Sequence, residues 1–521
     1  MRKKTNYLKA AVGMAVLLCG ITAVQPDSME AQAASKVKIS AQNFPDRNFR
    51  TAVKKFDTNK DGYLQRAEIK KVKSIRLKVT QKSNWYVANF QGIEYFTELQ
   101  SFTYGGTCYK STKTLDLSKN KKLRSVTVGA VSNASTMSAV KKINLKNLKN
   151  LKSVSICNNK NLETLTLDGC TGLQKLTIDS IQKLPLKKLD LSTCHALQAV
   201  KVEGEIGNTS LKSISFGTAD NLKRLEVNNT AVTKLAAAKL KGLQTLSLDH
   251  CKKLKTLDLS KNTKLTSLSL RLASITSLNT AKNTKLATLS VENVPLAQLD
   301  VTKNTKLTDV SLNALKVSSL DLSKNTALTA LALQDITVKD LDVSRYQNLT
   351  TLYLNSVACT ALDLTQNEKL KELSLNGISI KALDLTKNDA LEHLSLLNIA
   401  LDSLDISHNT KLTELDLYSL PLKELDLTKN TELKRIALVS LSVETLDLTN
   451  AVKLERLSIV TLPVKELDLS KNANLIWIQA VETQLQQLDV SQTKITKDGL
   501  VPGTEEDQVN VDAGVKVVYA E

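Results

Sequence analysis

The chain has 521 residues, which is long for one compact core, and its formal net charge is +19. Only 4% of the residues are aromatic, which argues against a surface rich in sugar-stacking Trp and Tyr. The basic residues are spread along the chain without a clustered stripe, so a nucleic-acid site is not expected, although attraction to anionic surfaces is.

Positions 1–33 have the pattern of a secretory signal peptide. A basic start is followed by an apolar run, Ala10–Val24, which is too short to span a bilayer comfortably. Ala31–Ala33 has the small-x-small form of a cleavage site. We therefore expect a mature chain from Ala34, secreted or associated with the cell surface and without a transmembrane segment. The alternatives are an uncleaved anchor and lipidation at Cys19, which the large preceding residue disfavours.

Residues 34–80 are expected to form a small helical, EF-hand-like cap. Residues 43–46, Asn-Phe-Pro-Asp, read as a helix start with Pro just inside the first turn, and a second helical run surrounds Ile69 and Val72. Between them, residues 57–68 match a 12-residue EF-hand loop, with Gly62 at the sharp turn.

This loop predicts one Ca²⁺ site, because calcium needs six to eight oxygen ligands and the spacing delivers them. The expected ligands are Asp57, Asn59, Asp61, the backbone carbonyl of Tyr63, Gln65 through a water, and both carboxylate oxygens of Glu68. The sequence shows no second loop, so the affinity should be modest and suited to an extracellular site. An EF-like turn that binds no metal is the alternative.

From Leu257 to Leu488 the chain repeats with a constant 21-residue period. The motif Leu-Asp-Leu-Ser/Thr-Lys-Asn begins at positions 257, 320, 383, 425 and 467, and a second Leu-x-Leu follows eleven positions after the first. Such a period indicates a solenoid, in which each unit buries its apolar face only by stacking on its neighbours. A long repetitive surface favours binding over catalysis.

Half-units continue less regularly from Leu115, with insertions near Ser135, Lys183 and Gly207. Each Leu-x-Leu has strand periodicity, and no room remains for a helix between them. We therefore expect a leucine-rich-repeat solenoid over residues 81–495, with short parallel strands on two sides of each 21-residue coil. About 17 coils would form a rod on the order of 80 Å long. Residues 496–521 are expected to be a polar C-terminal cap or tail.

The unit Leu-x-x-Leu-x-Leu-x-x-Asn/Cys, nested twice in each 21-residue repeat, resembles the bacterial leucine-rich repeats sometimes called IRREKO over roughly residues 99–493. The preceding segment resembles the EF-hand-like module found before such repeats in exported proteins of Gram-positive bacteria. There is a looser likeness to internalins, which place a helical cap ahead of the repeats. The second half-unit departs from the pattern, because the position expected to hold Asn usually holds an apolar residue in this chain, as at Val294.

Aspartate occupies the residue between the two apolar positions in eleven of twelve registers from Leu257, and Asn279 is the exception. The central members of this acidic column are the candidate ligand surface: Asp300, Asp321, Asp342, Asp363, Asp384, Asp405 and Asp426. Asp258, Asp447, Asp468 and Asp489 complete the column. One interpretation is a solvated ladder, relieved by Lys or Arg three residues on and by nearby hydroxyls. The other is an acidic track for a basic ligand or for cations.

Three further columns repeat through the coils. The strand face opposite the acidic column carries mostly small residues, as at Ser269 and Ser290, and is either a flat binding surface or a stacking surface. A column of Asn, as at Asn262 and Asn325, is expected to satisfy backbone groups between coils. Cys170, Cys194 and Cys251 fall in that column and Cys359 in an apolar one, so these cysteines are expected to be buried without disulfides.

No catalytic constellation is visible, and the four histidines are scattered. The sequence therefore predicts a non-enzymatic, exported recognition protein, expected to be monomeric, that adheres to a protein or surface-polymer ligand. The alternative is a structural cell-envelope component retained by charge on anionic wall polymers. An enzyme with a site in the irregular region, Val126 to Leu257, is a more distant alternative.

Overall fold

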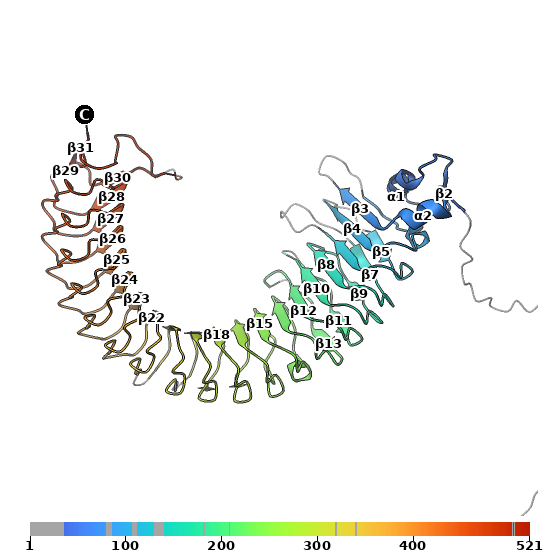
Figure 1. The fold of residues 1–521 in the computed structure, drawn as a ribbon, viewed down its shortest axis with the longest axis horizontal. Helices are drawn as coiled ribbons and strands as arrows, with labels where there is room; N and C mark the ends of the chain where they lie inside the picture. Colours follow the sequence, from blue (N-terminus) through green and yellow to red (C-terminus); the bar gives the residue numbers. More distant parts are fainter. Residues whose placement is uncertain are drawn as a thin grey trace, which may run out of the picture.

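The computed structural model describes residues 36–79, 86–106, 112–129, 140–180, 183–207, 209–317, 320–338, 341–502, 504 and 506–520. The chain forms a parallel solenoid that curves into an open arc, with a small helical cap at its N-terminal end (Figure 1). The predicted solenoid is confirmed, and the expected rod is bent into an arc. The proposed signal peptide, residues 1–33, lies outside the described residues.

The cap is a short helix–loop–helix unit. Its helices are α1 (Arg47–Val53), continued by the 3-10 turn η1 (Lys54–Phe56), and α2 (Arg66–Lys71). Asp46 caps α1 by accepting a hydrogen bond from the backbone N–H of Phe49 at 2.8 Å, so Pro45 precedes the helix instead of lying in its first turn. The loop strand β2 (Tyr63–Gln65) pairs antiparallel with β1 (Lys36–Lys38).

One long parallel sheet lines the concave side of the arc, which we call the inner face (Figure 1). Within the described residues it has 20 strands, joined in chain order by parallel pairs. They are β3 (Ser74–Val79), β4 (Ser101–Gly106), β6 (Ser125–Val128), β8 (Ser153–Cys157), β10 (Lys175–Asp179), β12 (Ala199–Glu203), β14 (Arg224–Asn228), β15 (Thr245–Asp249), β16 (Ser267–Arg271), β18 (Thr288–Glu292), β20 (Asp309–Asn313), β21 (Ala330–Gln334), β22 (Thr351–Asn355), β23 (Glu372–Asn376), β24 (His393–Leu397), β25 (Glu414–Tyr418), β26 (Arg435–Val439), β27 (Arg456–Val460), β28 (Trp477–Val481) and β30 (Val509–Val511).

The convex side, which we call the outer face, carries fewer strands than the inner face in the described part of the chain, and they have two to five residues (Figure 1). They form four small sheets: β5 (Thr112–Asp116), β7 (Val140–Asn144) and β9 (Thr164–Thr166); β11 (Lys188–Leu191) and β13 (Ser213–Phe216); β17 (Leu278–Asn279) and β19 (Leu299–Asp300); β29 (Gln487–Asp489) and β31 (Lys516–Val518). Two further 3-10 turns are η2 (Ile93–Tyr95) and η3 (Ala237–Lys239). The expected second strand is therefore present in some coils, and the other described outer segments form no strand.

This difference between the faces explains the curvature. On the inner face, ladder hydrogen bonds hold successive strands about 4.8 Å apart. Most outer segments lack such a ladder in the described residues, so the coils splay on that side and the solenoid bends. The pairing register advances by the same 21-residue step from each strand to the next between Ser267 and Trp477, in line with the sequence period.

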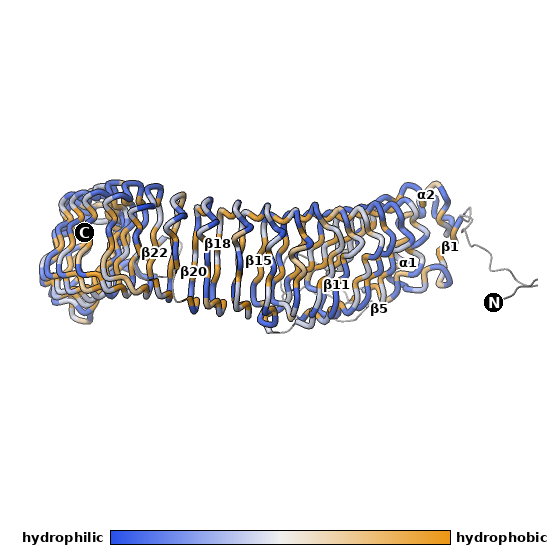
Figure 2. The backbone as a smooth tube through the Cα atoms, turned by 90° about the horizontal axis from the view of Figure 1, so that it is seen from below, coloured by the Kyte–Doolittle hydropathy of each residue, from blue (hydrophilic) through white to orange (hydrophobic). Residues whose placement is uncertain are grey.

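The coils share one continuous apolar core, built mainly of leucines (Figure 2). A fully buried asparagine ladder runs through it on the outer side: Asn262, Asn283, Asn304, Asn325, Asn367, Asn388, Asn409, Asn430 and Asn472. Each amide nitrogen donates to two carbonyls of the preceding coil; Asn388 Nδ2, for example, lies 3.1 Å from Leu364 O and 3.0 Å from Asn367 O. The predicted structural role of these asparagines is confirmed.

Several residues replace asparagine in this ladder. Cys170, Cys194 and Cys251 donate from Sγ to a carbonyl of an earlier coil, at 3.0, 3.7 and 3.2 Å. The hydroxyl of Tyr346 donates to Leu322 O at 3.3 Å. These three cysteines and Cys359 are buried and unpaired, which confirms their predicted burial, and Cys157 is also buried and unpaired.

The ends of the solenoid differ from the expected boundaries. β3, within the segment assigned to the cap, already pairs with β4 and begins the inner sheet. At the other end, β30 pairs with β28 and β31 pairs with β29, so residues assigned to a polar cap or tail form a closing coil. Lys183 and Gly207, near two predicted insertions, lie outside regular strands, whereas Ser135 lies outside the described residues.

Candidate functional site on the two faces of the solenoid

The acidic column lies on the outer face, where each aspartate closes a turn of its own coil. In all eleven cases the carboxylate accepts a hydrogen bond from the backbone N–H two residues later. Asp363 Oδ1, for example, lies 2.9 Å from Thr365 N and 2.7 Å from the Thr365 hydroxyl. Asn279 makes the same contact with Ala281 N at 3.0 Å. The outward aspartates therefore have a local structural role.

The same hydrogen bonds also lower the pKa values of the aspartates in the column. Hydrogen bonds from the Thr365 hydroxyl and N–H lower the pKa of Asp363, and equivalent donors lower the pKa of the other column members. Among the described residues, the only column member in an ion pair is Asp342, at 2.8 Å from Arg345. Local donors, more than direct ion pairs, keep these exposed carboxylates ionised.

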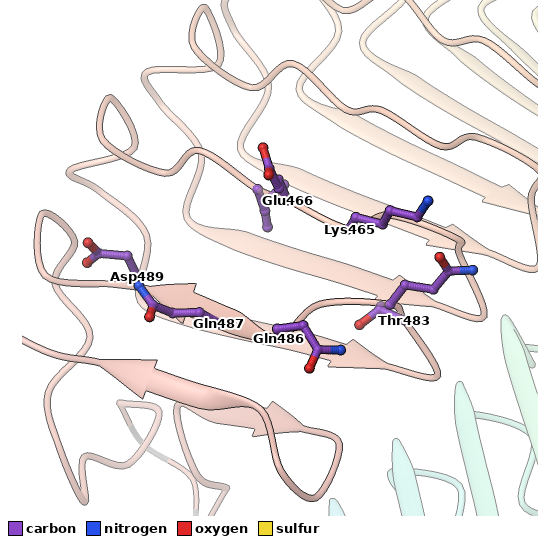
Figure 3. Close-up of a pocket in the computed structure, with 8 residues that line it drawn as sticks. Lys465, Glu466, Thr483, Gln486, Gln487 and Asp489 are labelled. Atoms are coloured by element: carbon purple, nitrogen blue, oxygen red, sulfur yellow. The ribbon is translucent and has the colours of Figure 1, made fainter.

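Two open grooves lie between successive coils on the outer face. The larger, about 870 Å³, is lined by Lys465, Glu466, Gln487 and Asp489 among others, and polar side chains project around it (Figure 3). A second, of about 370 Å³, lies beside Asp258. Both adjoin the acidic column, at its first and last members. The grooves lie between coils because the coils splay apart on the outer face.

The inner face presents three outward side chains from each strand. From β16 to β21 the central column holds small residues, Ser269, Ser290, Ser311 and Ala332, as the sequence predicted. From β22 onward this uniformity ends, because Tyr353 and Asp416 occupy the same column. The inner face therefore changes character in its C-terminal half.

The last outward position of each inner strand changes most sharply. From β16 to β23 it is polar: Arg271, Glu292, Asn313, Gln334, Asn355 and Asn376. From β24 to β28 it is apolar and half-buried: Leu397, Tyr418, Val439, Val460 and Val481. We call these five residues the apolar stripe. They were not predicted from the sequence, where only the central column was compared between coils, although the same 21-residue spacing aligns them.

Beside the stripe, charged residues of three inner strands converge. Asp416 is only 8% exposed, and its Oδ2 lies 2.9 Å from Arg435 Nη1 and 3.5 Å from His393 Nε2. Arg435 Nη1 also lies 3.5 Å from Glu414 Oε2. Farther along the face, the Arg456 guanidinium lies 5.9 Å from the ring centroid of Trp477, within reach of a cation–π interaction.

The converging charges shift two pKa values. Burial raises the pKa of Asp416, but His393 and Arg435 outweigh it, so the pKa is lowered. Contact with Asp416 raises the pKa of His393, and burial opposes that rise only in part. The histidines were predicted to be scattered. The contact between His393 and Asp416, which follows one coil and two residues later, was not predicted from the sequence.

The predicted calcium loop is present as a compact turn between η1 and α2. Asp57 Oδ2 accepts from Gly62 N at 3.0 Å, Asn59 Oδ1 from Asp61 N at 3.2 Å, and Asp61 Oδ1 from Tyr63 N at 2.8 Å. Asp57 Oδ1 is buried without a hydrogen-bond partner. Calcium prefers oxygen ligands, so an unpartnered carboxylate oxygen at the first ligand position is the kind of ligand that the predicted ion needs.

The closing ligand is held differently from what metal binding requires. Glu68 Oε1 accepts from the N–H and the hydroxyl of Thr58, both at 2.6 Å, and Oε2 accepts from Gln65 N at 2.9 Å. Burial raises the pKa of Glu68, but these hydrogen bonds outweigh it and lower the pKa. Among the described residues, no three His, Cys, Asp or Glu side chains already form a metal cluster. Glu68 would have to share its oxygens with these donors, or release them, to coordinate an ion.

The described cysteines offer no reactive thiolate. Burial raises the pKa of Cys170 to about 11 and that of Cys194 to about 12, far from the depressed values of nucleophilic cysteines. No helix in the described part of the chain is long and apolar enough to cross a membrane. The absence of catalysis remains a prediction.

No protein-family model and no curated protein matches this chain. Among solved structures, a leucine-rich-repeat protein of Leptospira interrogans is 18% identical, with a TM-score of 0.51 over 65% of this chain and 86% of that chain. The functional domain of InlJ from Listeria monocytogenes, which includes a cysteine ladder, is 20% identical, with a TM-score of 0.47 over 87% and 82%. An internalin, inlF, from Listeria monocytogenes is 15% identical, with a TM-score of 0.40 over 80% and 95%. The Leptospira likeness supports the leucine-rich-repeat fold and nothing beyond the fold.

Proposed function

We propose that this chain is a non-catalytic recognition protein that binds a protein partner on the inner face of β22–β28. The observation that supports this proposal is the contrast between the faces. Outer residues repeat from coil to coil, and their hydrogen bonds lie within the solenoid. Outward inner residues of β22–β28 vary more from coil to coil, and they combine the apolar stripe with Tyr, Trp and Arg side chains, which dominate protein interfaces.

The rigidity of the inner face also favours recognition. Its side chains stand on a hydrogen-bonded parallel sheet, so little conformational entropy is lost when a partner docks. The apolar stripe is half-buried along five successive strands, which gives a continuous apolar strip beside the charged residues. An apolar centre with a polar rim is the arrangement expected of a protein interface.

A capture experiment with matched variants tests the proposal. The full chain, an inner triple variant (Tyr418→Ala, Arg456→Ala, Trp477→Ala) and an outer triple variant (Asp342→Asn, Asp363→Asn, Asp384→Asn) are immobilised and exposed to host and bacterial extracts. We expect a partner that saturates the wild type and the outer triple and is lost from the inner triple, with melting temperatures confirming that all three are folded. Loss from the outer triple alone would instead assign recognition to the acidic column.

We further propose that the protein is exported and acts at or near the bacterial surface, as an adhesin. The leader-like residues 1–33 and the net charge of +19 support this proposal. The same charge supports the competing role of an envelope component held on anionic polymers. Release of the protein from intact cells by about 1 M salt would favour the envelope role, because salt at that strength screens surface charges within about 3 Å.

We also propose that the cap binds one Ca²⁺ ion, on the basis of the unpartnered Asp57 Oδ1 and the oxygen-only ligand set. Calorimetry on the full chain should show one site. The Glu68→Gln variant should bind much more weakly, whereas the distant Glu163→Gln control should not differ from the wild type. Absence of both heat and a melting-temperature shift at millimolar calcium would disprove the site.

A further inference from the structure

A hollow of about 220 Å³ lies on the inner face over β22–β25. It is lined by Tyr353, Glu372, Ser374, His393, Ser395 and Asp416, together with strand backbone and buried leucines. Small-molecule sites usually enclose about 300–1,000 Å³. A smaller, open hollow on a broad sheet suits one side chain of a larger partner better than a separate small molecule.

The hollow and its surroundings hold more negative than positive charge. Glu372, Glu414 and Asp416 are three carboxylates. Arg435 contacts Glu414 and Asp416, whereas Lys371, which pairs with Glu392, interacts with Glu372 only through its charge. His393 adds a second positive charge only when it is protonated. The position therefore has an uncompensated negative charge that a cationic group would neutralise.

Asp416 provides a second, independent indication. It is more than nine-tenths buried, and although Oδ2 faces Arg435, Oδ1 is buried without a hydrogen-bond partner. A buried carboxylate oxygen without a donor costs free energy, and a cation that enters the hollow would offset part of this cost electrostatically. Tyr353 stands beside the small side chains of Ser374 and Ser395, so an aliphatic stem can approach the floor of the hollow.

We infer that this hollow receives a lysine or arginine side chain of the protein partner, while apolar residues of the same segment pack on the apolar stripe. The inference rests on the proposed function and specifies its ligand chemistry. His393 and Glu414 begin the strands whose last outward residues, Leu397 and Tyr418, start the stripe. One short partner segment can therefore reach both features.

The same geometry makes His393 a competitor for the site. The ionisable groups that face it are Glu372 on β23, and Glu414 and Asp416 on β25, with Arg435 on β26 beyond them. Once protonated, His393 supplies the positive charge that the partner would otherwise bring. Binding should therefore weaken as the pH falls from about 8.5 to about 5.5, a range in which histidine titrates and the carboxylates do not.

The test uses a phage-displayed library of random peptides selected on the full chain. Recovered peptides are synthesised, together with analogues in which Arg is replaced by citrulline or Lys by norleucine. Affinities are measured by fluorescence anisotropy for the wild type, Asp416→Asn, Glu372→Gln and the control Asp309→Asn. Asp309 is an exposed inner-face carboxylate on β20, outside the hollow, and Glu372 is exposed, so its variant should fold even if Asp416→Asn does not.

We expect peptides that combine Lys or Arg with apolar residues. Binding should weaken about ten-fold or more in the neutral analogues and in both hollow variants, and stay within about two-fold in the control. His393→Asn should flatten the pH dependence.

Peptides that lack basic residues, or that bind Asp416→Asn and Glu372→Gln like the wild type, would overturn the inference. If such peptides are lost from the inner triple variant, the proposed function stands without the inference. Peptides that bind the inner triple variant as tightly as the wild type, or a selection that yields no peptides, would overturn both the inference and the proposed function.

Discussion

The inner and outer faces of this solenoid are built by the same coil, but they use repetition differently. On the outer face the Asp, Ser or Thr, and Asn of the motif recur because each makes a defined hydrogen bond within the scaffold. On the inner face only the buried leucines must recur, and the outward residues are free to differ. Strict repetition therefore marks structure here, and we propose that departure from it marks recognition. Four substitutions test the scaffold half of this comparison.

The largest effect is expected for a leucine of the outer half-coil. Leu364 is fully buried, so Leu364→Ala should lower the free energy of unfolding by about 2–5 kcal/mol, from lost transfer energy and a cavity. Chemical denaturation measures the loss. Leu500→Ala, at a residue that is 52% exposed, is the control and should have little effect. A loss below about 1 kcal/mol for Leu364→Ala would mean that the outer side is not tightly packed.

The asparagine ladder should rank next. Asn388→Ala leaves two buried carbonyl contacts without their donor, so a loss of about 2–3 kcal/mol is expected in the same assay. Asn388→Cys should lose less, because cysteine donates to a carbonyl at the equivalent place in earlier coils. Equal losses for the two variants would show that the side-chain donor contributes nothing.

One coil offers the reverse experiment. Ala451 occupies the ladder position between Asn430 and Asn472, is buried, and has no side-chain donor. Ala451→Asn should restore contacts to the carbonyls of the preceding coil and raise the free energy of unfolding by about 1 kcal/mol. Destabilisation would show that the core has closed around the smaller side chain.

The smallest effect is expected in the acidic column. Asp363→Ala removes the acceptor for Thr365 N and should lower the melting temperature slightly, whereas Asp363→Asn should preserve most of it, as Asn279 does naturally. Because hydrogen bonds lower the pKa of folded Asp363, its ionised form stabilises the protein above about pH 4, and this contribution is lost as the pH falls through the folded-state pKa. Thermal melts from neutral to acid pH should therefore show the wild type converging on Asp363→Asn.

The fold was largely predictable from sequence because its cause is local and repeated. A strand at every Leu-x-Leu, buried leucines and inward asparagines follow from period and polarity. The curvature of the solenoid was not predictable from the sequence, because it depends on which side of the coil forms a continuous ladder of hydrogen bonds. Outer segments such as 362–364 carry the strand pattern in sequence, but they form no strand in the described structure.

The candidate site was less predictable, for a related reason. The repeat drew attention to Asp342 and its equivalents, whose turn hydrogen bonds could not be read from spacing alone. The inner patch depends on departures from the repeat, at positions such as Leu397 and Asp416. Only neighbouring coils in register bring Asp416 against His393 and Arg435.

The most direct test of the division between faces is hydroxyl-radical footprinting of the full chain, with and without the partner captured by the wild type. Two histidines form a matched pair, His393 on the inner face and His408 exposed in an outer turn. We predict that the partner lowers oxidation of His393, Tyr418 and Trp477 and leaves His408 unchanged. Protection of His408 with undiminished oxidation of the three inner residues would contradict the account.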